Sequence, residues 1–202
     1  MFVFPFETIT QNKEKIMLEI RWHSRAGQGA VTGAKGLADV IAGTGKEVQA
    51  FATYGSAKRG ATMAAFDRFD DTPILNHEKY MEPDYVLVID PGLTFIADIF
   101  ENEKPTTKYI ITTHLSKEEL QEKKPELKDR EFYIVDCIKI SLEALGKPIP
   151  NAPMLGAFIK ESGLLPIEEF KEAFKKVLGK KLPQKIIDAN MVAIQRAYDE
   201  VH

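Results

Sequence analysis

The stretch Leu18-Glu-Ile-Arg-Trp-His-Ser-Arg-Ala-Gly-Gln-Gly-Ala-Val-Thr-Gly33 decides the fold, because a strand pattern passes through a glycine turn directly into a helix pattern. From Ile20 to His23, apolar and polar side chains alternate with the two-residue period of a strand. Gly27 and Gly29 permit a tight turn, and apolar residues then recur at helical spacing from Ala30 to Ala42. Free backbone N–H groups and the positive end of a helix dipole would meet at this turn, so it is a candidate anion site.

The glycine turn departs from the two common nucleotide-binding motifs. The dinucleotide fingerprint Gly-x-Gly-x-x-Gly fails, because the third glycine, Gly33, comes one residue late. The next predicted strand, Lys46–Thr53, ends without the acidic residue that would hold a ribose. No Gly-Lys-Ser/Thr follows the turn, which argues against a P-loop. Two interpretations remain: the turn binds a phosphate, or it only connects a strand to a helix.

The rest of the chain predicts an α/β fold. Tyr85–Asp90 is a continuous apolar and β-branched run ending in an acid, typical of a central parallel strand. The acid, Asp90, lies where α/β sheets place ligand groups, or else it caps a helix or a turn. Ser116 and Glu119 form a capping box at the start of a helix. Further strands are expected at Ala61–Phe69, Lys108–Thr113 and Glu131–Asp136, with a short helix or loop at Leu93–Asn102 and a helix at Ile138–Leu145.

A proline-rich break divides the predicted domain. Three prolines between Lys147 and Pro153 predict an irregular segment, and three helices are expected after it: Met154–Ser162, Pro166–Leu178 and Pro183–Val201. We therefore predict an α/β fold, a Rossmann-like layered domain with a largely parallel sheet and a C-terminal helical segment. Residues 1–17 are expected to be an N-terminal extension, and residues 18–202 a single domain with its α/β core to about residue 146 and a helical tail at 153–202.

Composition narrows the possible functions. The net charge of −3 argues against a nucleic-acid or anionic-membrane partner. No apolar run reaches the roughly 18 residues of a membrane span, and the N-terminus makes a poor signal peptide, so a cytoplasmic protein is expected. The single cysteine, Cys137, excludes an intrachain disulfide and a four-cysteine iron–sulfur cluster within this chain. It lies in a strand-like run, which favours a buried, inert thiol.

The sequence contains no self-contained active site. It has no Gly-x-Ser-x-Gly elbow and no His-Glu-x-x-His, and the four histidines (His23, His77, His114 and His202) are scattered, so neither catalytic residues nor metal ligands are assigned. Arg25 and the cationic pair Lys58 and Arg59 could flank the glycine turn and hold a phosphate or carboxylate. Alternatively, these cations are surface charges or form ion pairs between subunits.

Several of these segments together resemble the gamma subunit of 2-oxoacid:ferredoxin oxidoreductases, of which pyruvate:ferredoxin oxidoreductase is the best-known member. They are Arg21–Ala30, Val48–Phe51, Tyr54-Gly55 with Arg59-Gly60, and Asn151–Gly163. The resemblance begins at about Leu18 and extends through Asn190. One loop departs from it, because Ser56-Ala-Lys-Arg-Gly60 replaces the family's usual Pro-Glu-x-Arg-Gly.

The resemblance implies a role within a larger enzyme. Such enzymes cleave a 2-oxoacid, most commonly pyruvate, with thiamine diphosphate, pass electrons through iron–sulfur (4Fe–4S) clusters to ferredoxin, and transfer the acyl group to coenzyme A. A gamma subunit carries no redox centre and assembles with alpha, beta and ferredoxin-like delta subunits. We hypothesise that this chain contacts the phosphates of coenzyme A through Arg25, Gly27, Gln28, Gly29, Ala30, Lys58 and Arg59. The alternative is a free-standing phosphate- or nucleotide-binding module without catalytic partners.

Overall fold

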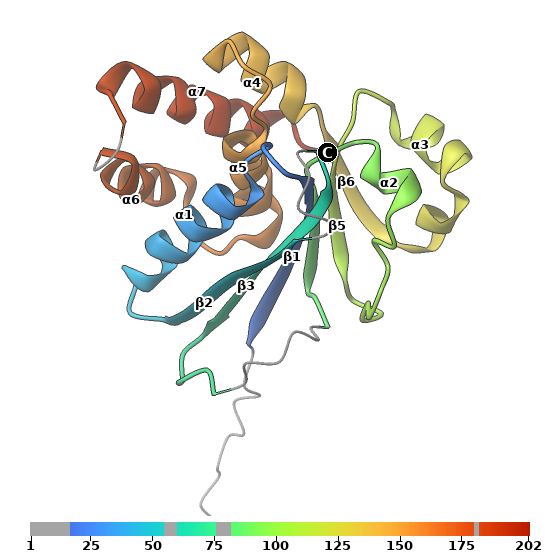
Figure 1. Ribbon diagram of the computed structural model, residues 1–202, viewed down its shortest axis with the longest axis horizontal. Helices are drawn as coiled ribbons and strands as arrows, with labels where there is room; N and C mark the ends of the chain where they lie inside the picture. Colours follow the sequence, from blue (N-terminus) through green and yellow to red (C-terminus); the bar gives the residue numbers. More distant parts are fainter. Residues whose placement is uncertain (1–16, 55–59, 76–81, 180–181) are drawn as a thin grey trace, which may run out of the picture.

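A six-stranded sheet in the order β2-β3-β1-β4-β5-β6 forms the centre of the computed structural model, which describes residues 17–54, 60–75, 82–179 and 182–202 (Figure 1). Strands β1, β4, β5 and β6 run parallel, whereas β3 is antiparallel to both β1 and β2. The mixed α/β fold and the largely parallel sheet predicted from the sequence are thus confirmed. The strands are β1 (Leu18–Arg25), β2 (Glu47–Tyr54), β3 (Thr62–Asp70), β4 (Tyr85–Val88), β5 (Lys108–Thr112) and β6 (Glu131–Val135).

Helices cover the two faces of the sheet unequally. One face carries five helices and the larger apolar core: α1 (Ala30–Ala42), α4 (Cys137–Leu145), α5 (Asn151–Ser162), α6 (Ile167–Gly179) and α7 (Gln184–Glu200). On the other face, α2 (Leu93–Ile96), α3 (Lys117–Lys123) and the 3-10 helix η1 (Pro125–Asp129) cover a smaller apolar cluster beneath β4, β5 and β6. No helix in the described part of the chain is long and apolar enough to cross a membrane.

The segment from β1 to α1 forms as its sequence pattern predicts. Trp22 is fully buried, and its ring lies against α1 at Gly33, where an added Cβ would be only 3.4 Å from the ring. The indole Nε1 donates to a carboxylate oxygen of Asp67 at 2.8 Å. Burial raises the pKa of this Asp67 carboxyl well above its usual range. The alternating pattern of β1 therefore packs one side of the strand beneath α1.

Two local predictions are corrected by the structure. Helix α5 begins at Asn151 rather than Met154, because Pro153 lies in its first turn, where a missing N–H costs no intrahelical bond. Cys137, expected in a strand, is the first residue of α4, since the Asp136 side chain caps that helix by accepting the Lys139 N–H at 2.9 Å. By contrast, the prediction of a short helix or loop at Leu93–Asn102 is confirmed, because one helical turn, α2, lies there.

Other local predictions are confirmed. The Ser116–Glu119 capping box opens α3. Cys137 is buried, and this burial raises the pKa of its thiol to about 12, so the thiol stays protonated. Of the four histidines, His77 lies outside the described residues.

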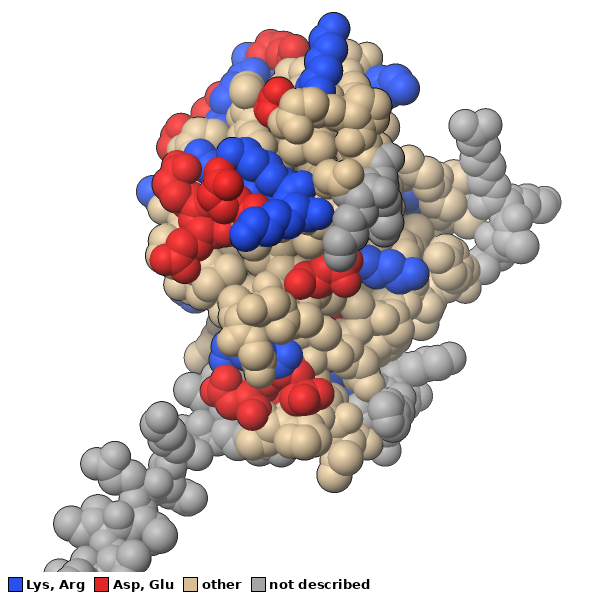
Figure 2. Space-filling view, turned by 90° about the vertical axis from the view of Figure 1, so that its left-hand side faces the viewer, with Lys and Arg blue, Asp and Glu red and all other residues tan. Residues whose placement is uncertain are grey.

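Charges on the α1 and α6 side of the molecule are mixed. Figure 2 shows Lys and Arg side chains interspersed with Asp and Glu, and not gathered into one large patch of either sign. On α6, for example, Lys171 pairs with Glu168 at 2.7 Å. This mixture agrees with the low net charge of the sequence.

Candidate functional site

The carboxyl ends of β1 and β4 form the switch point of the sheet. The two strands are parallel neighbours, and the chain leaves β1 for α1 on one face but leaves β4 for α2 on the other (Figure 1). Open α/β sheets bind ligands in the crevice that such a divergence creates. The glycine turn predicted as an anion site lies at this position.

Both glycines of the turn have backbone conformations that other residues adopt rarely. Gly27 has φ +104° and Gly29 has φ +89°. Gly29 is the N-cap of α1, and among the described residues no side chain is found bonded to the first turn of this helix. Its backbone N–H groups therefore remain available to water or to a ligand.

Helix α5 supports the turn from behind. Asn151 donates its side-chain amide to the Gly29 carbonyl at 3.3 Å. A Cβ on Gly29 would lie 2.8 Å from the same amide nitrogen, which is too close for an ordinary contact. Gly29 is thus required both for its positive φ and for the approach of the C-terminal helices to the turn.

Gln28 and Asp90 join the turn to the end of β4. The Gln28 Oε1 accepts hydrogen bonds from the Arg25 N–H at 2.9 Å and the Ser24 hydroxyl at 3.2 Å, while its Nε2 donates to Asp90 Oδ2 at 2.6 Å. Arg25 Nε lies 3.4 Å from the same Asp90 oxygen. The Asp90 side chain therefore stabilises the switch point by bonding to Gln28 and Arg25. In the following turn it is the Asp90 backbone carbonyl that accepts a hydrogen bond, from the Leu93 N–H at 3.0 Å.

Arg25 also contacts the far side of the loop that follows β2. Its Nη1 donates to the Gly60 carbonyl at 3.2 Å, and the Ala26 N–H donates to the Ala61 carbonyl at 3.0 Å. Of the predicted site, the structure brings together Arg25, Gly27, Gln28, Gly29 and Ala30, whereas Lys58 and Arg59 lie outside the described residues.

His23 lies near the carboxyl end of β1, two residues before Arg25. Burial and then the positive charge of Arg21 lower its pKa to about 3, so the ring is neutral at physiological pH. Its Nε2 is buried without a hydrogen-bond partner in the described part of the chain. Within the same residues, no group of three or more His, Cys, Asp or Glu side chains could hold a metal ion.

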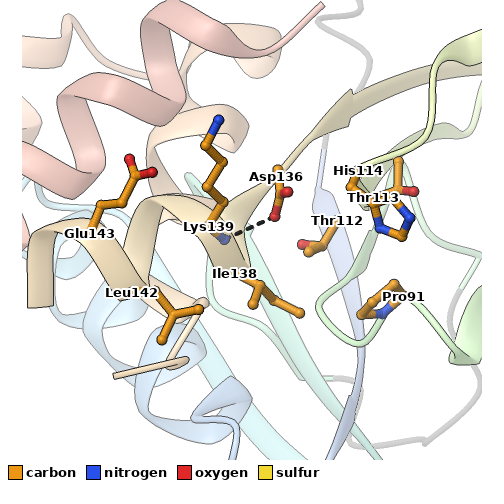
Figure 3. A pocket seen from close by; sticks show the side chains of 9 residues that line it. All are labelled: Pro91, Thr112, Thr113, His114, Asp136, Ile138, Lys139, Leu142 and Glu143. Atoms are coloured by element: carbon orange, nitrogen blue, oxygen red, sulfur yellow. Dashed lines mark hydrogen bonds between the residues drawn. The ribbon is translucent and has the colours of Figure 1, made fainter. Parts of the chain in front are cut away.

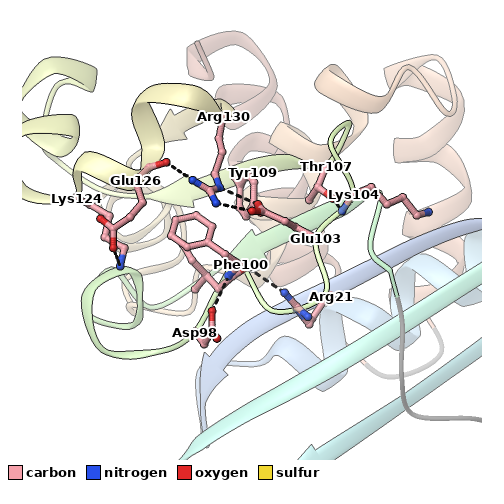
Figure 4. A network of polar contacts seen from close by, with 11 residues as sticks. Arg21, Asp98, Phe100, Glu103, Lys104, Thr107, Tyr109, Lys124, Glu126 and Arg130 are labelled. Carbon is pink, nitrogen blue, oxygen red and sulfur yellow. Dashed lines mark hydrogen bonds and ion pairs between the residues drawn. The ribbon is translucent and has the colours of Figure 1, made fainter.

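A second polar cluster lies at the opposite end of β5 (Figure 4). Arg130 Nε donates to Glu103 Oε2 at 2.7 Å, and the Arg130 guanidinium lies 4.0 Å from the centre of the Phe100 ring. Tyr109 also donates to Glu103, and Arg21 Nη2 donates to the Ile99 carbonyl at 3.0 Å. These groups are largely bonded to one another, which is typical of a structural network.

Sequence reasoning missed a pocket of about 420 Å³ at the carboxyl ends of β5 and β6 (Figure 3). Thr112, Thr113 and His114 come from the end of β5, and Asp136 comes directly after β6. Polar residues that follow two neighbouring buried strands were the signal for it in the sequence. Its remaining lining residues are Pro91, Ile138, Lys139, Leu142 and Glu143.

Comparison with known proteins identifies the family. Residues 19–200 match the family described as pyruvate ferredoxin/flavodoxin oxidoreductase. The chain belongs to this family. The resemblance noted in the sequence, to a gamma subunit within it, is confirmed by the relatives that follow.

The relatives are similar over nearly their whole length. The pyruvate/ketoisovalerate oxidoreductases common subunit gamma of Pyrococcus furiosus is 42% identical over 184 residues, which cover 91% of this chain and 97% of that protein. The crystal structure of pyruvate oxidoreductase subunit PORC from Thermotoga maritima matches with a TM-score of 0.79 and 36% identity, covering 94% of this chain and 98% of that one.

A more distant structure shares the fold alone. The 2-oxoglutarate:ferredoxin oxidoreductase from Magnetococcus marinus, solved with 2-oxoglutarate, coenzyme A and succinyl-CoA bound, matches with a TM-score of 0.70 at 19% identity. The match covers 92% of this chain but 31% of that chain. In that enzyme the fold is therefore one part of a longer polypeptide.

Proposed function

We propose that this chain is the non-redox gamma subunit of a cytoplasmic 2-oxoacid:ferredoxin oxidoreductase that converts pyruvate to acetyl-CoA and reduces ferredoxin. Its partners are alpha, beta and ferredoxin-like delta subunits, which hold thiamine diphosphate and the iron–sulfur clusters. The observation that carries this proposal is the end-to-end similarity to gamma subunits named for pyruvate and ketoisovalerate oxidoreductases. The single cysteine supports it, since one thiol cannot ligate a four-cysteine cluster.

Within the complex, the glycine turn is proposed to bind the phosphates of coenzyme A. The uncapped first turn of α1 offers backbone N–H groups and the positive end of the helix dipole. The Arg25 side chain is one-third exposed, and it uses Nε and Nη1 for Asp90 and Gly60; Nη2 forms no bond to a described residue and could reach an anion. The Asp90 carboxylate opposes a phosphate at this position, so the backbone groups supply most of the attraction.

Exposed apolar side chains support a role in assembly. Among the large hydrophobic residues of the described chain, Tyr54 is 67% exposed at the end of β2 and Val192 is 54% exposed on α7. These positions lie beside the loop and on the helical tail, where an interface with other subunits was expected from the sequence. An interface formed by these elements would bury both side chains.

Kinetics of the purified complex test the coenzyme A contact. Arg25→Gln and Arg59→Gln should each raise the apparent KM for coenzyme A by about three- to tenfold, because each removes a charged hydrogen-bond donor. The KM for the 2-oxoacid should not change. Lys46→Gln is the matched control, because Lys46 pairs with Asp71 at the start of β2, away from the turn. An unchanged KM for coenzyme A in both arginine variants contradicts the contact.

Purification from the native host tests the assembly and the substrate. An iron-containing complex that reduces ferredoxin with a 2-oxoacid and coenzyme A would support the gamma-subunit proposal. Comparison of pyruvate with branched-chain 2-oxoacids and 2-oxoglutarate then identifies the preferred acid. A colourless chain that purifies alone under gentle anaerobic conditions would instead favour the free-standing phosphate- or nucleotide-binding module.

A further inference from the structure

The pocket at the ends of β5 and β6 has the size of a small-molecule site. Its volume of about 420 Å³ lies within the usual range of roughly 300–1,000 Å³ for ligand pockets. Figure 3 shows the side chains of its walls, which come from the turn after β4, the end of β5, and the segment from Asp136 into α4. It therefore lies on the carboxyl edge of the parallel strands, where ligands bind in this class of fold.

A buried hydroxyl with no strong partner lines this pocket. Thr112 is fully buried, and its Oγ1 has no hydrogen-bond partner among the residues that the structure describes. Its polar neighbour is the Cys137 thiol. Burial raises the pKa of this thiol, and the Thr112 hydroxyl lowers it by a smaller amount. A thiol is a weak hydrogen-bonding group, so Thr112 retains most of its capacity to bond a ligand.

The other polar groups of the pocket differ in whether they are already bonded. Asp136 uses Oδ1 to cap α4, and the structure gives its other carboxylate oxygen no bond to a described residue. Lys139 forms no ion pair with a described residue, whereas Glu143 pairs with Arg196 at 2.8 Å. A carboxylate oxygen, a hydroxyl, a cation and the exposed ring of His114 are therefore available to a ligand.

Three residues form the apolar part of the wall. Pro91 and Ile138 are half-buried, and Leu142 is 47% exposed at the rim. A flat, uncharged ring system can lie against such a surface while its polar substituents reach the hydroxyl and the carboxylate.

We propose that this pocket binds the nucleoside part of a nucleotide. The base lies against Pro91, Ile138 and Leu142, the ribose hydroxyls bond to Asp136 and Thr112, and the phosphate is attracted to Lys139. Pro91 directly follows Asp90, so the pocket adjoins the glycine turn along the same edge of the sheet. Coenzyme A and free adenine nucleotides share this chemistry; for coenzyme A, the assignment rests on the proposed function.

Calorimetric titration of the full chain tests this assignment with AMP, coenzyme A and pantetheine. Thr112→Val removes the hydroxyl but keeps the shape of the side chain, and Asp136→Asn keeps a good helix cap but removes the charge. Ser141→Ala is the control, because Ser141 lies on α4, the helix that Asp136 caps, but does not line the pocket. The Ser141 hydroxyl donates to the Ile138 carbonyl at 2.9 Å. Arg25→Gln is measured in parallel to report on the glycine turn.

We expect AMP and coenzyme A to bind the wild-type chain, and Thr112→Val to weaken both by about three- to tenfold through the lost hydrogen bond. The melting temperature of this variant should stay equal or rise, because a poorly bonded buried hydroxyl is removed. Asp136→Asn should also weaken binding, and Ser141→Ala should not. Coenzyme A that binds at least tenfold more tightly than AMP would identify coenzyme A as the ligand, and equal affinities would identify a free nucleotide.

Two results would overturn the assignment: no binding of AMP or coenzyme A at millimolar concentration, or wild-type affinity in both pocket variants. The parallel variant separates this failure from that of the proposed function. Coenzyme A binding that depends on Arg25 but not on Thr112 would leave the glycine-turn contact standing and remove the pocket. If AMP binding depends on Thr112 and Arg25→Gln leaves coenzyme A binding unchanged, the pocket stands and the glycine-turn contact is removed.

Discussion

Replacing Gly156 by alanine should force helices α5 and α7 apart. Gly156 lies on α5 where that helix crosses α7, and an added Cβ would be 2.0 Å from the Ile194 carbonyl oxygen and 2.9 Å from its carbonyl carbon. Both atoms belong to the backbone of a buried part of α7, so no side chain can rotate away. The helices must separate by about 1.5 Å to restore an ordinary contact of roughly 3.5 Å.

Two opposing terms set the size of the effect. Alanine favours a helix interior over glycine by about 1 kcal/mol. Overpacking of a close contact costs typically about 1–3 kcal/mol and occasionally more, and a backbone contact this short belongs at the upper end. The steric term therefore dominates, and we expect a net loss of about 2 kcal/mol or more in the free energy of unfolding. For a chain of 202 residues this lowers the melting temperature by about 4–8 °C.

Urea and thermal unfolding followed by circular dichroism measure this change. Gly179→Ala is the matched control, because the same added methyl group meets nothing within 4 Å at the end of α6. That variant should be neutral or more stable than the wild type by up to about 1 kcal/mol. A Gly156→Ala protein as stable as the Gly179→Ala protein would refute the close packing of α5 on α7.

Three further perturbations have defined outcomes. Arg68→Met should lower the free energy of unfolding by about 3–5 kcal/mol, because the buried Glu19 carboxylate loses the Arg68 Nε that lies 2.8 Å from it. In the same urea titration, the double variant Glu19→Met, Arg68→Met should recover most of this loss. The free energy of unfolding should decrease as the pH falls from about 6.5 towards 3, because His23 can take up a proton in the unfolded chain but not in the native site. Urea unfolding at a series of pH values measures this decrease. Between pH 6.5 and 5, the decrease should be smaller in His23→Gln by up to about 2 kcal/mol. Asp90→Asn keeps an acceptor for Gln28 but removes a negative charge from the turn, so the complex should show a lower apparent KM for coenzyme A, most clearly at low salt; a raised KM would place the phosphates elsewhere.

The elements that the sequence predicted well depend on neighbours along the chain. Helix α1 begins at Ala30 and ends at Ala42, as its apolar period indicates, because the glycines before it and the pattern within it are local. The same is true of the capping box at Ser116. Pro153 misled the prediction, since a proline disrupts a helix interior but is tolerated in the first turn, and only the position of the cap distinguishes the two cases.

The contacts that make the site were hidden because they join distant positions. Gln28 and Asp90 are 62 residues apart, and Asn151 reaches a glycine 122 residues away. Neither separation leaves a periodic trace in the sequence. The pocket was missed for the same reason, as Thr112 and Asp136 come together only through the parallel pairing of β5 with β6.

These distant contacts also explain why the glycine turn and the C-terminal helices belong to one functional unit. Asn151 opens α5 and at the same time holds the carbonyl of Gly29, the residue that starts α1. A shift of α5 therefore moves the point from which the first N–H groups of α1 project. Since α5 is itself fixed by its backbone contact with α7 at Gly156, the packing of the helical segment determines the geometry of the turn. Substitutions far from the glycine turn, if they loosen α5 against α7, should then weaken anion binding at the turn without removing any group that contacts the anion.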